Sequence, residues 1–358
     1  MKISNSLLAA LCASLAAAAP TLQSLDFSEY SVEKRADPSL VGYLGAFFLG
    51  DEPSVYFYRS NGNNALSFSA LNGGQPVIVP TQGTGGVRDP TIVAGGGAEA
   101  GKKWYIIGTD LDIAKTTWDA AQRTGSRGIL IWESTDLVTW TNERLIVVED
   151  ETAGMVWAPE ALWDEERGQY LVHWSSKFYA AEDTAHTGSP GAIKIRSAYT
   201  SDFQTFTEPQ DYVDYSPSSV IDLTFLPLGN NAYARFIKNE TATNVFTEIS
   251  TDGLFGTWNR PGGRTAIIQQ GVEGPAAYWD NQVDGQAYLL LDFFGGDGYA
   301  PYQSTDVESG TWTAADKTNF PIDLRHGSVL AVDQARYDAL GGAFAADQAL
   351  IEITWRKS

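Results

Sequence analysis

A short turn signature recurs along this chain, and it restricts the fold more than any other feature. In each clear copy, serine or threonine stands two residues before aspartate, and an aromatic residue follows four to six residues later. Serine, threonine and aspartate close tight turns by bonding to the backbone, and the aromatic residue can pack the next strand. The clear copies are Ser134–Asp136 with Trp140, Thr200–Asp202 with Phe206, Ser250–Asp252 with Trp258 and Ser304–Asp306 with Trp312, and a weaker copy is Ser60–Gly62 with Phe68.

The spacing of these copies predicts an all-β, five-bladed β-propeller. Short runs rich in β-forming residues lie between the copies, and only residues 116–124 and 333–340 look capable of forming a helix. The copies recur roughly every 50 to 74 residues, which is the length of a four-stranded blade with variable loops. A β-sandwich with hairpin turns is the alternative that this pattern leaves open. No linker divides residues 36–358, so we expect a single domain.

The first 35 residues have the pattern of segments that are removed during secretion. Residues 1–19 are typical of a signal peptide, with a basic start, an apolar stretch and small residues before Pro20. Residues 20–35 end in Lys34-Arg35, which predicts a propeptide cut at a dibasic site, although an exposed, unstructured N-terminus is the alternative. The single cysteine, Cys12, lies in the predicted signal, so we expect a secreted, extracellular chain that is folded without disulfides.

The charge of the chain restricts its partners. A net charge of −20 at pH 7 predicts repulsion from nucleic acid and from anionic membranes, and it is compatible with a neutral plant cell-wall polysaccharide or oligosaccharide. The 11 Trp, 16 Tyr and 16 Phe residues suit sugar binding, because aromatic rings stack on the apolar faces of sugars, but β-strands use the same residues for packing. We expect a monomer, with Asn239 as a glycosylation site because Asn239-Glu240-Thr241 is a sequon.

Three acids stand among apolar or rigid neighbours in widely separated parts of the chain. They are Asp89 before a proline, Asp222 within an apolar run, and Glu273 before glycine and proline. A lone acid in such surroundings is costly unless it is paired or protonated. Two carboxylates with separated pKa values that flank one bond are the usual means of cleaving a glycoside. Capping of a turn or pairing with a neighbour such as Arg88 is the structural alternative for these aspartates.

Five motifs together resemble those of glycoside hydrolase family 43, over about residues 43 to 340. The motifs are Arg88-Asp89-Pro90, Val156-Trp157-Ala158-Pro159-Glu160, Ile221-Asp222, Glu273-Gly274-Pro275 and Arg325-His326-Gly327-Ser328-Val329. Each motif alone is moderately specific, but all five in order form a specific set. One departure is Leu223, where many members have proline. The resemblance implies a five-bladed propeller that cleaves arabinose or xylose glycosides.

The resemblance also implies a role for each of the three acids. Asp89 is expected to be the general base that activates a water molecule, and Glu273 the general acid that protonates the leaving oxygen. Asp222 is expected to orient Glu273 and to raise its pKa as a like-charged neighbour.

Further residues are expected to bind the substrate or to shape its pocket. His326 should lie near the propeller axis, bonded to the base or to a water molecule or ion, with ordinary core burial as the alternative. Arg325 is expected to donate to a sugar hydroxyl or to pair with an acid such as Asp323. Trp157 is a candidate sugar platform or a core residue. Phe47 and Phe48 are expected in the pocket wall, and Tyr299 on a flexible rim loop.

The sequence favours a glycosidase over other kinds of enzyme. It has no phosphate-binding loop, no nucleotide fingerprint and no cluster of Cys and His for zinc. We expect an inverting, exo-acting α-L-arabinofuranosidase that acts on arabinan or arabino-oligosaccharides, and the preference for arabinose is what the resemblance implies. A β-xylosidase of the same fold and a non-catalytic carbohydrate-binding propeller remain as alternatives. No cofactor is expected to be required, and a structural calcium or sodium ion at the axis is left open.

Overall fold

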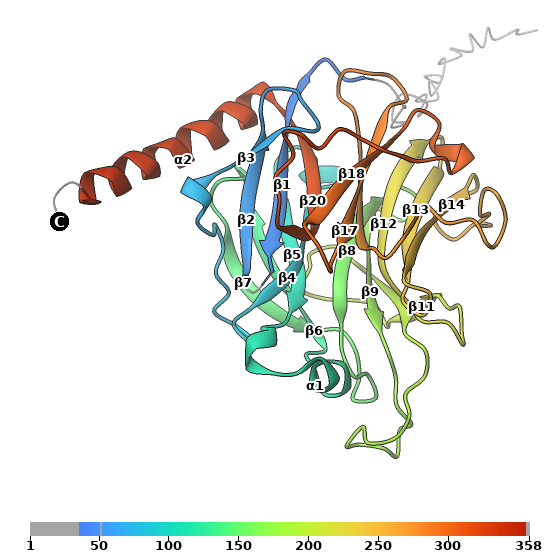
Figure 1. Ribbon diagram of the computed structural model, residues 1–358. Helices are drawn as coiled ribbons and strands as arrows, with labels where there is room; N and C mark the ends of the chain where they lie inside the picture. The colour runs from blue at the N-terminus through green and yellow to red at the C-terminus, as the bar shows by residue number, and fades with distance from the viewer. Residues whose placement is uncertain (1–35, 51, 356–358) are drawn as a thin grey trace, which may run out of the picture. The chain divides into compact units, whose positions relative to one another are not determined.

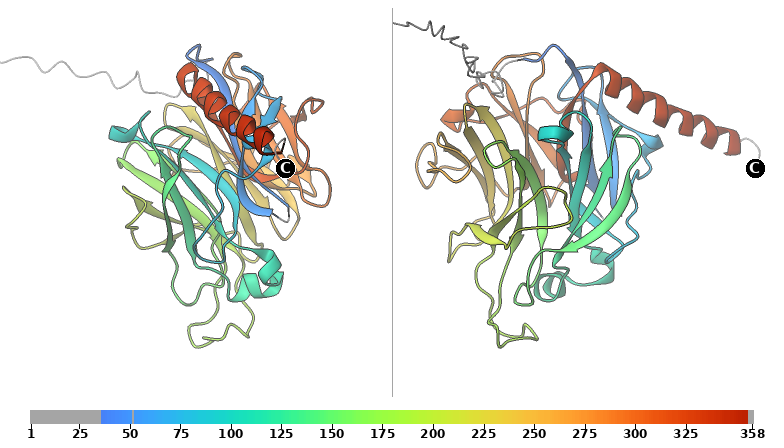
Figure 2. Two further views of the ribbon diagram at one scale, coloured as in Figure 1. Left: turned by 90° about the vertical axis from the view of Figure 1, so that its left-hand side faces the viewer. Right: turned by 180° about the vertical axis from the view of Figure 1, so that it is seen from behind.

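The computed structural model describes residues 36–50 and 52–355, with side chains as far as residue 345. These residues form five four-stranded antiparallel sheets, which confirms the predicted five-bladed propeller (Figures 1 and 2). The predicted signal peptide, the propeptide and Cys12 lie outside the described residues. None of the helices within the described ranges combines the length and the apolar character needed to cross a membrane.

Each blade is built from strands that follow one another in the chain, except the last blade, which joins both ends. Strands are given from the innermost outward. The first two blades in the chain are β4 (Val87–Ala94), β5 (Trp104–Asp110), β6 (Gly128–Ser134) and β7 (Thr141–Val147), and then β8 (Trp157–Asp164), β9 (Gln169–Ser176), β10 (Lys194–Thr200) and β11 (Gln210–Val213); the next two are β12 (Val220–Gly229), β13 (Ala232–Asn239), β14 (Asn244–Ser250) and β15 (Gln269–Gln270), and then β16 (Glu273–Trp279), β17 (Ala287–Phe293), β18 (Gly298–Ser304) and β19 (Thr313–Ala314). The blade that joins both ends of the chain is β20 (Leu324–Asp333), β1 (Leu40–Leu49), β2 (Glu52–Ser60) and β3 (Phe68–Ala70).

The innermost strands form a ring in which each strand contacts the next, and β20 contacts both β16 and β4. β20 also pairs with β1 along almost its whole length, so the C-terminal strand closes the ring on the N-terminal one (Figure 1). Closure of this kind leaves no edge in the ring of blades exposed.

Every copy of the turn signature lies between the third and fourth strands of a blade. In the four clear copies, the aspartate N–H donates to the serine or threonine hydroxyl at 3.1–3.4 Å, as the side-chain chemistry predicts. In the weaker copy, the Ser60 hydroxyl instead donates to the carbonyl of Gly62 at 2.6 Å. The repeat therefore marks the same position in all five blades, which is why it predicted their number.

Helices are few in the part of the chain that the structure describes, and most of them lie in loops between strands of one blade. α1 (Trp118–Arg123) lies within the predicted 116–124 segment, and the side chain of Thr117 caps it by accepting from Ala120 N. α2 (Gln334–Trp355) follows β20 directly and is longer than predicted. The remaining helices are single 3₁₀ turns: η2 (Asn72–Gly74), η3 (Gly97–Glu99), η4 (Ile113–Lys115) and η5 (Val307–Ser309).

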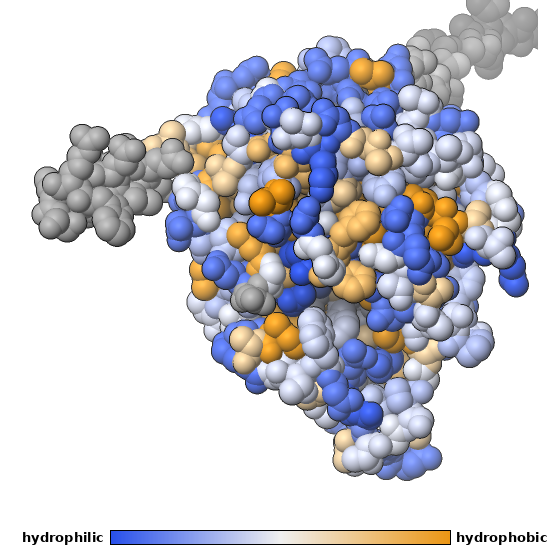
Figure 3. Space-filling model, viewed as in Figure 1, coloured by the Kyte–Doolittle hydropathy of each residue, from blue (hydrophilic) through white to orange (hydrophobic). Residues whose placement is uncertain are grey.

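The apolar core is divided among the blade interfaces. Five large clusters of buried apolar side chains occur in the described residues, and each joins two neighbouring blades. Leu340 and Phe344 of α2 add to the cluster between the β1 and β4 blades. On the outside, hydrophilic residues surround small, separate apolar patches (Figure 3). Blade-to-blade packing thus supplies the cohesion that disulfides cannot supply here.

Phe47 provides a test of the packing around the closing blade. Its side chain is fully buried in β1 and meets Tyr58 and Tyr299 edge-on, with ring centroids 5.9 and 5.8 Å apart. Phe47→Ala should lower the free energy of unfolding by about 3–5 kcal/mol, because it removes this burial and leaves a cavity. Chemical denaturation measures the loss. Phe255→Ala, at a side chain that is 57% exposed, is the control and should change stability by less than about 0.5 kcal/mol. Similar losses in both variants would contradict this account.

Candidate active site

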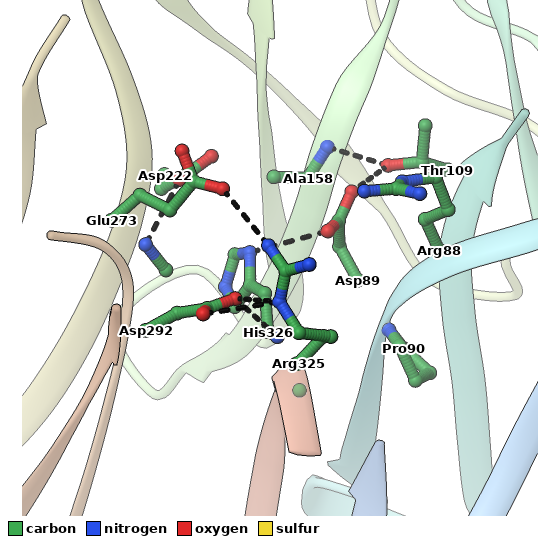
Figure 4. Close-up of polar contacts among 12 residues, drawn as sticks. Arg88, Asp89, Pro90, Thr109, Ala158, Asp222, Glu273, Asp292, Arg325 and His326 are labelled. Atoms are coloured by element: carbon green, nitrogen blue, oxygen red, sulfur yellow. Dashed lines mark hydrogen bonds and ion pairs between the residues drawn. The ribbon is translucent and has the colours of Figure 1, made fainter. Parts of the chain in front are cut away.

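The first residues of the five inner strands meet at one end of the propeller axis. Asp89 comes from β4, Asp222 from β12 and Glu273 from β16, while β20 supplies Arg325 and His326 (Figure 4). Contacts described below connect all five residues into one cluster. The structure therefore brings together the three acids that the sequence singled out, although 184 positions separate the first from the last.

A bulge at the start of each inner strand directs these side chains. Pairing with the second strand shifts register in all five blades at this point. Four of the bulges contain a residue with left-handed backbone, with φ between 47° and 53°: Asp89, Ala158, Asp222 and Gly274. This conformation is unfavourable for residues with a Cβ, and aspartate tolerates it better than most. Strained backbone at three non-glycine residues therefore coincides with the candidate site.

Proline follows the left-handed residue in three blades and Leu223 follows it in the fourth. Proline suits a bulge because it has no N–H to pair. Asp222 has φ 51°, close to the 52° of Asp89, so the departure at Leu223 leaves the backbone conformation unchanged. At Gly274, an added Cβ would lie 2.7 Å from Cγ of His326. Glycine is thus needed there for close approach of the histidine as well as for its positive φ.

Asp89 is held in its ionised form. The Thr109 hydroxyl donates to Asp89 Oδ2 at 2.7 Å, and His326 Nδ1 lies 3.4 Å from Oδ1. Burial by itself would raise the pKa of Asp89, but His326, Arg88 and Thr109 together outweigh burial and lower it. Ala158 N in turn donates to Thr109 Oγ1 at 2.7 Å, which fixes the hydroxyl rotor. A partly exposed, ionised carboxylate with a fixed orientation is suited to accept a proton from water.

His326 lies between two carboxylates. Besides Asp89, its Nε2 is 3.9 Å from Oε1 of Glu160, and Thr224 donates to the other oxygen of Glu160 at 2.8 Å. Burial would lower the pKa of His326, but Asp89, Glu160 and Asp222 raise it well above its ordinary value. The histidine is therefore a buried cation bonded to the expected base, as one of the two sequence interpretations held. Glu160 therefore supports this histidine from β8.

Asp222 is buried and faces the backbone of the third acid. Its Oδ2 accepts a hydrogen bond from Gly274 N at 3.0 Å, and its own N–H donates to Ser175 Oγ at 3.3 Å. Burial and the charge of Glu273 raise the pKa of Asp222, His326 and Lys238 lower it, and the net result is a pKa of about 7. Asp222 thus fixes the residue that follows Glu273 and is near the midpoint of its titration at neutral pH.

Glu273 is the most exposed of the three acids and contacts two cations. Its side chain is 25% exposed, compared with 16% for Asp89. Lys238 Nζ donates to Oε2 at 2.7 Å, and Arg325 Nη2 lies 3.6 Å from Oε1. Arg325 is also bonded through Nε to both oxygens of Asp292, at 2.8 and 3.1 Å. Of the two interpretations for Arg325, the structure supports pairing with an acid, but the partner is Asp292 rather than Asp323.

Two expectations about the pocket were wrong. Phe47 does not form a pocket wall, because its side chain points into the core between blades. Successive strand residues face opposite ways, so the neighbouring Phe48 lies beside Arg88, and the guanidinium of Arg88 is 4.3 Å from the ring centroid of Phe48. Tyr299 is not on a rim loop. It lies in β18, is buried, and its hydroxyl donates to the carbonyl of Gly274 at 2.7 Å while accepting from Gly327 N at 2.9 Å.

Trp157 lies at the edge of the site and is partly buried. It packs against a small apolar cluster, and it meets the ring of Trp118 edge-on, with centroids 6.0 Å apart. Trp118 is 50% exposed at the start of α1, and its ring is 5.3 Å from the guanidinium of Arg88. Trp118 could not be singled out from the sequence, since one tryptophan among 11 has no signal of its own.

Other contributors were also overlooked. Lys238 and Asp292 lie on the second strands of their blades, behind the ring of inner strands. Thr109 also lies on a second strand, β5 of the β4 blade. A charged residue inside an apolar run was the signal available for Asp292, in the segment Ala287–Phe293. Thr109 and Lys238 did not stand out, because single polar residues occur in many β-strands, and only the structure shows that both are buried.

The described residues offer little support for an axial metal ion. No group of three or more His, Cys, Asp or Glu residues within them is arranged to hold one. The positive charge at the axis belongs to His326, whose ring nitrogens face carboxylates on both sides. The axial calcium or sodium ion stays a prediction. A cavity of about 760 Å³ is lined by loops that contain Thr124, Asp150 and Asp183, and none of the three acids of the candidate site lines it.

Protonation of Asp222 should make stability depend on pH. With a folded pKa of about 7 and an ordinary value of 3.8, the folded protein keeps a proton that the unfolded chain releases. Stability therefore falls as pH rises from about 4 to 7. Asp222→Asn removes this effect, so the variant should gain roughly 1–4 kcal/mol relative to the unaltered protein between pH 4 and pH 7.5. Denaturant titrations at both pH values measure the gain, and a constant difference would contradict the buried, protonated state.

Comparisons with known proteins show the family to which this chain belongs. Residues 38–338 match the model of a family described as a probable glycosyl hydrolase domain, related to glycoside hydrolase family 43. A curated α-L-arabinofuranosidase from Bifidobacterium longum subsp. longum is 35% identical over 225 residues, which cover 59% of this chain and 21% of that protein. The chain thus spans about a fifth of the length of this relative.

Solved structures of low sequence identity are also similar. The catalytic domain of an α-L-arabinofuranosidase of glycoside hydrolase family 62 from Coprinopsis cinerea is 15% identical, with a TM-score of 0.45, over 70% of this chain and 75% of that one. An exo-β-1,3-galactanase from Phanerochaete chrysosporium is 12% identical, with a TM-score of 0.43, over 66% of this chain and 52% of that one. The family match, by contrast, spans most of the chain. The protein therefore belongs to this family of probable glycosyl hydrolase domains related to family 43, and its fold is a five-bladed β-propeller.

Proposed function

We propose that this protein is a secreted, inverting, exo-acting α-L-arabinofuranosidase that releases arabinose from arabinan or arabino-oligosaccharides. The observation that carries the proposal is the division of three neighbouring carboxylates into three different environments. Asp89 is ionised and oriented, Asp222 is buried behind the site, and Glu273 is the most exposed. Separate acid and base carboxylates are what glycoside hydrolysis requires.

Each acid has a role that its contacts support. Asp89 takes a proton from water, since Thr109 and His326 keep it ionised and fix its orientation. Glu273 protonates the leaving oxygen from the exposed side of the cluster. Asp222 orients Glu273 by accepting from Gly274 N. Water attacks the anomeric carbon opposite the leaving group in a single step, so no covalent intermediate forms.

Support for arabinose comes from the curated relative, which is named as an α-L-arabinofuranosidase. A neutral sugar is compatible with the acidic chain, and the exposed ring of Trp118 offers a flat apolar surface beside Trp157 for it. Asn239 is the proposed glycosylation site; its side-chain oxygen accepts from Ala242 N, and the turn that follows β13 is exposed. The β-xylosidase activity is the second candidate, because the same acids would cleave either sugar.

Substrate choice and stereochemistry test the proposal directly. Initial rates on an aryl α-L-arabinofuranoside should exceed those on the matching aryl β-D-xyloside by at least about tenfold, a difference of roughly 1.4 kcal/mol in transition-state binding. Proton NMR of early product should show β-L-arabinose, the inverted anomer. Faster turnover of the xyloside would favour the β-xylosidase, retained configuration would end the inverting mechanism, and sugar binding without turnover would indicate a binding propeller.

Leaving-group dependence tests the assignment of acid and base. Glu273→Gln should lose roughly 10²–10⁴-fold in kcat on arabino-oligosaccharides and far less on an aryl glycoside with an activated leaving group, which departs without protonation. Asp89→Ala should lose similar activity on both substrates, because water needs its base in each case. Circular dichroism should show that both variants are folded. Equal losses by both variants on both substrates would remove the assignment.

A further inference from the structure

A line of alternating charges passes through the proposed acid. Lys238 lies between Glu273 and Glu240, with Nζ 2.7 Å from Oε2 of Glu273 and 2.6 Å from Oε2 of Glu240. On the other side, Arg325 lies between Glu273 and Asp292. Each cation that contacts Glu273 therefore has a second carboxylate of its own.

Burial makes this second carboxylate necessary. The side chain of Lys238 is only 4% exposed and that of Arg325 is 18% exposed. A buried cation without a counter-charge is strongly unfavourable. A general acid is neutral when protonated and charged after it has given up its proton, so Glu273 alone cannot serve as a constant partner for either cation. Glu240 and Asp292 keep both cations paired in either state.

The two carboxylates differ in how they can act. Asp292 is fully buried and also accepts from His326 N at 3.2 Å, so it is part of the framework of β20. Glu240 is 40% exposed, lies in the turn after β13, and its closest charged partner is Lys238. Glu240 therefore acts on the acid through one lysine and from outside the set of three acids.

We propose that Glu240 is a positioning residue of the reaction, which holds Lys238 so that Glu273 can carry its proton to the leaving group. This inference rests on the proposed function. The charged groups that face Glu273 are Lys238 from β13, Arg325 from β20, Asp292 from β17 and Asp222 from β12. Arg88 from β4 adds a more distant positive charge.

The direction in which loss of Glu240 moves the pH profile can be predicted. Without Glu240, the carboxylates near Lys238 that remain are Glu273 and Asp222. The charge of Lys238 is then no longer partly neutralised by Glu240, so Lys238 stabilises an ionised Glu273 more strongly. The acid then gives up its proton at lower pH, and the alkaline limb of the kcat/KM profile moves to lower pH. Lys238→Met removes the cation and should move the same limb in the opposite direction.

The experiment compares Glu240→Gln with the unaltered protein on two substrates. The glutamine keeps the size of the side chain and the Asn239 sequon. On arabino-oligosaccharides, kcat should fall about tenfold and the alkaline limb should move down by about 0.5 pH unit or more. On an aryl glycoside with an activated leaving group, kcat should fall less than about threefold. Glu240→Asp, which keeps the charge, should recover part of the loss.

Asp211→Asn is the matched control. Asp211 is 44% exposed and pairs with a lysine at 2.9 Å, like Glu240, but it lies on the outermost strand of the β8 blade. This variant should leave both limbs and both rates unchanged. An unshifted alkaline limb in Glu240→Gln, or equal losses on both substrates, would overturn the positioning role while leaving the proposed function intact. If the unaltered protein hydrolysed no glycoside, the proposed function and the inference would fail together.

Discussion

Antiparallel pairing between β1 and β20 is the interaction on which the remaining structure depends. It closes the ring of blades, and it places the start of β20 beside β16 and β4. His326 and Arg325 reach the axis only because of this pairing. His326 then contacts Asp89, and Arg325 contacts Glu273, so closure of the fold and assembly of the candidate site are the same event. The apolar clusters between blades stabilise the ring once it has closed.

Bulges convert this ring into a chemical site. A regular strand alternates its side chains between two faces, so regular strand geometry does not by itself direct an acid at the start of the strand toward the axis. The left-handed residues at the bulges redirect the chain there, and they place Asp89 and Asp222 among donors that hold them. The backbone strain is compensated by hydrogen bonds that Thr109 and Gly274 donate to these aspartates and by one that Asp222 N donates to Ser175. The bulges and their left-handed residues are therefore part of what positions the acids in this site.

Electrostatics then give the acids different properties. Asp89 faces a histidine whose charge is shared with Glu160, and Asp222 is buried with only a backbone N–H at its Oδ2. Glu273 faces two cations that have partners elsewhere. These differences come from groups on the second strands and on other blades, so the ring of five inner strands is supported by a second layer of charged residues. One fold can thus hold several carboxylates within a small volume without all of them being ionised together.

Sequence alone determined the number of blades and the chain segments that supply the site. The turn signature depends on hydrogen bonds between side chains and backbone groups two residues away. Because these contacts are local in the chain, the signature can be recognised as a repeat in the sequence. The acids at Asp89, Asp222 and Glu273 were visible because each is an ionisable group in surroundings that do not favour charge. Their location on separate inner strands followed from the repeat.

Tertiary structure alone decided which groups surround those acids. Lys238, Asp292 and Thr109 are ordinary residues in their own strands, and only strand pairing and blade packing bring them to the site. The orientation of Phe47 and Tyr299 was likewise beyond reach, since a shift of one residue in a strand exchanges core for pocket. Sequence patterns report interactions over a few residues, whereas the partner of a buried charge is set by contacts between segments far apart in the chain.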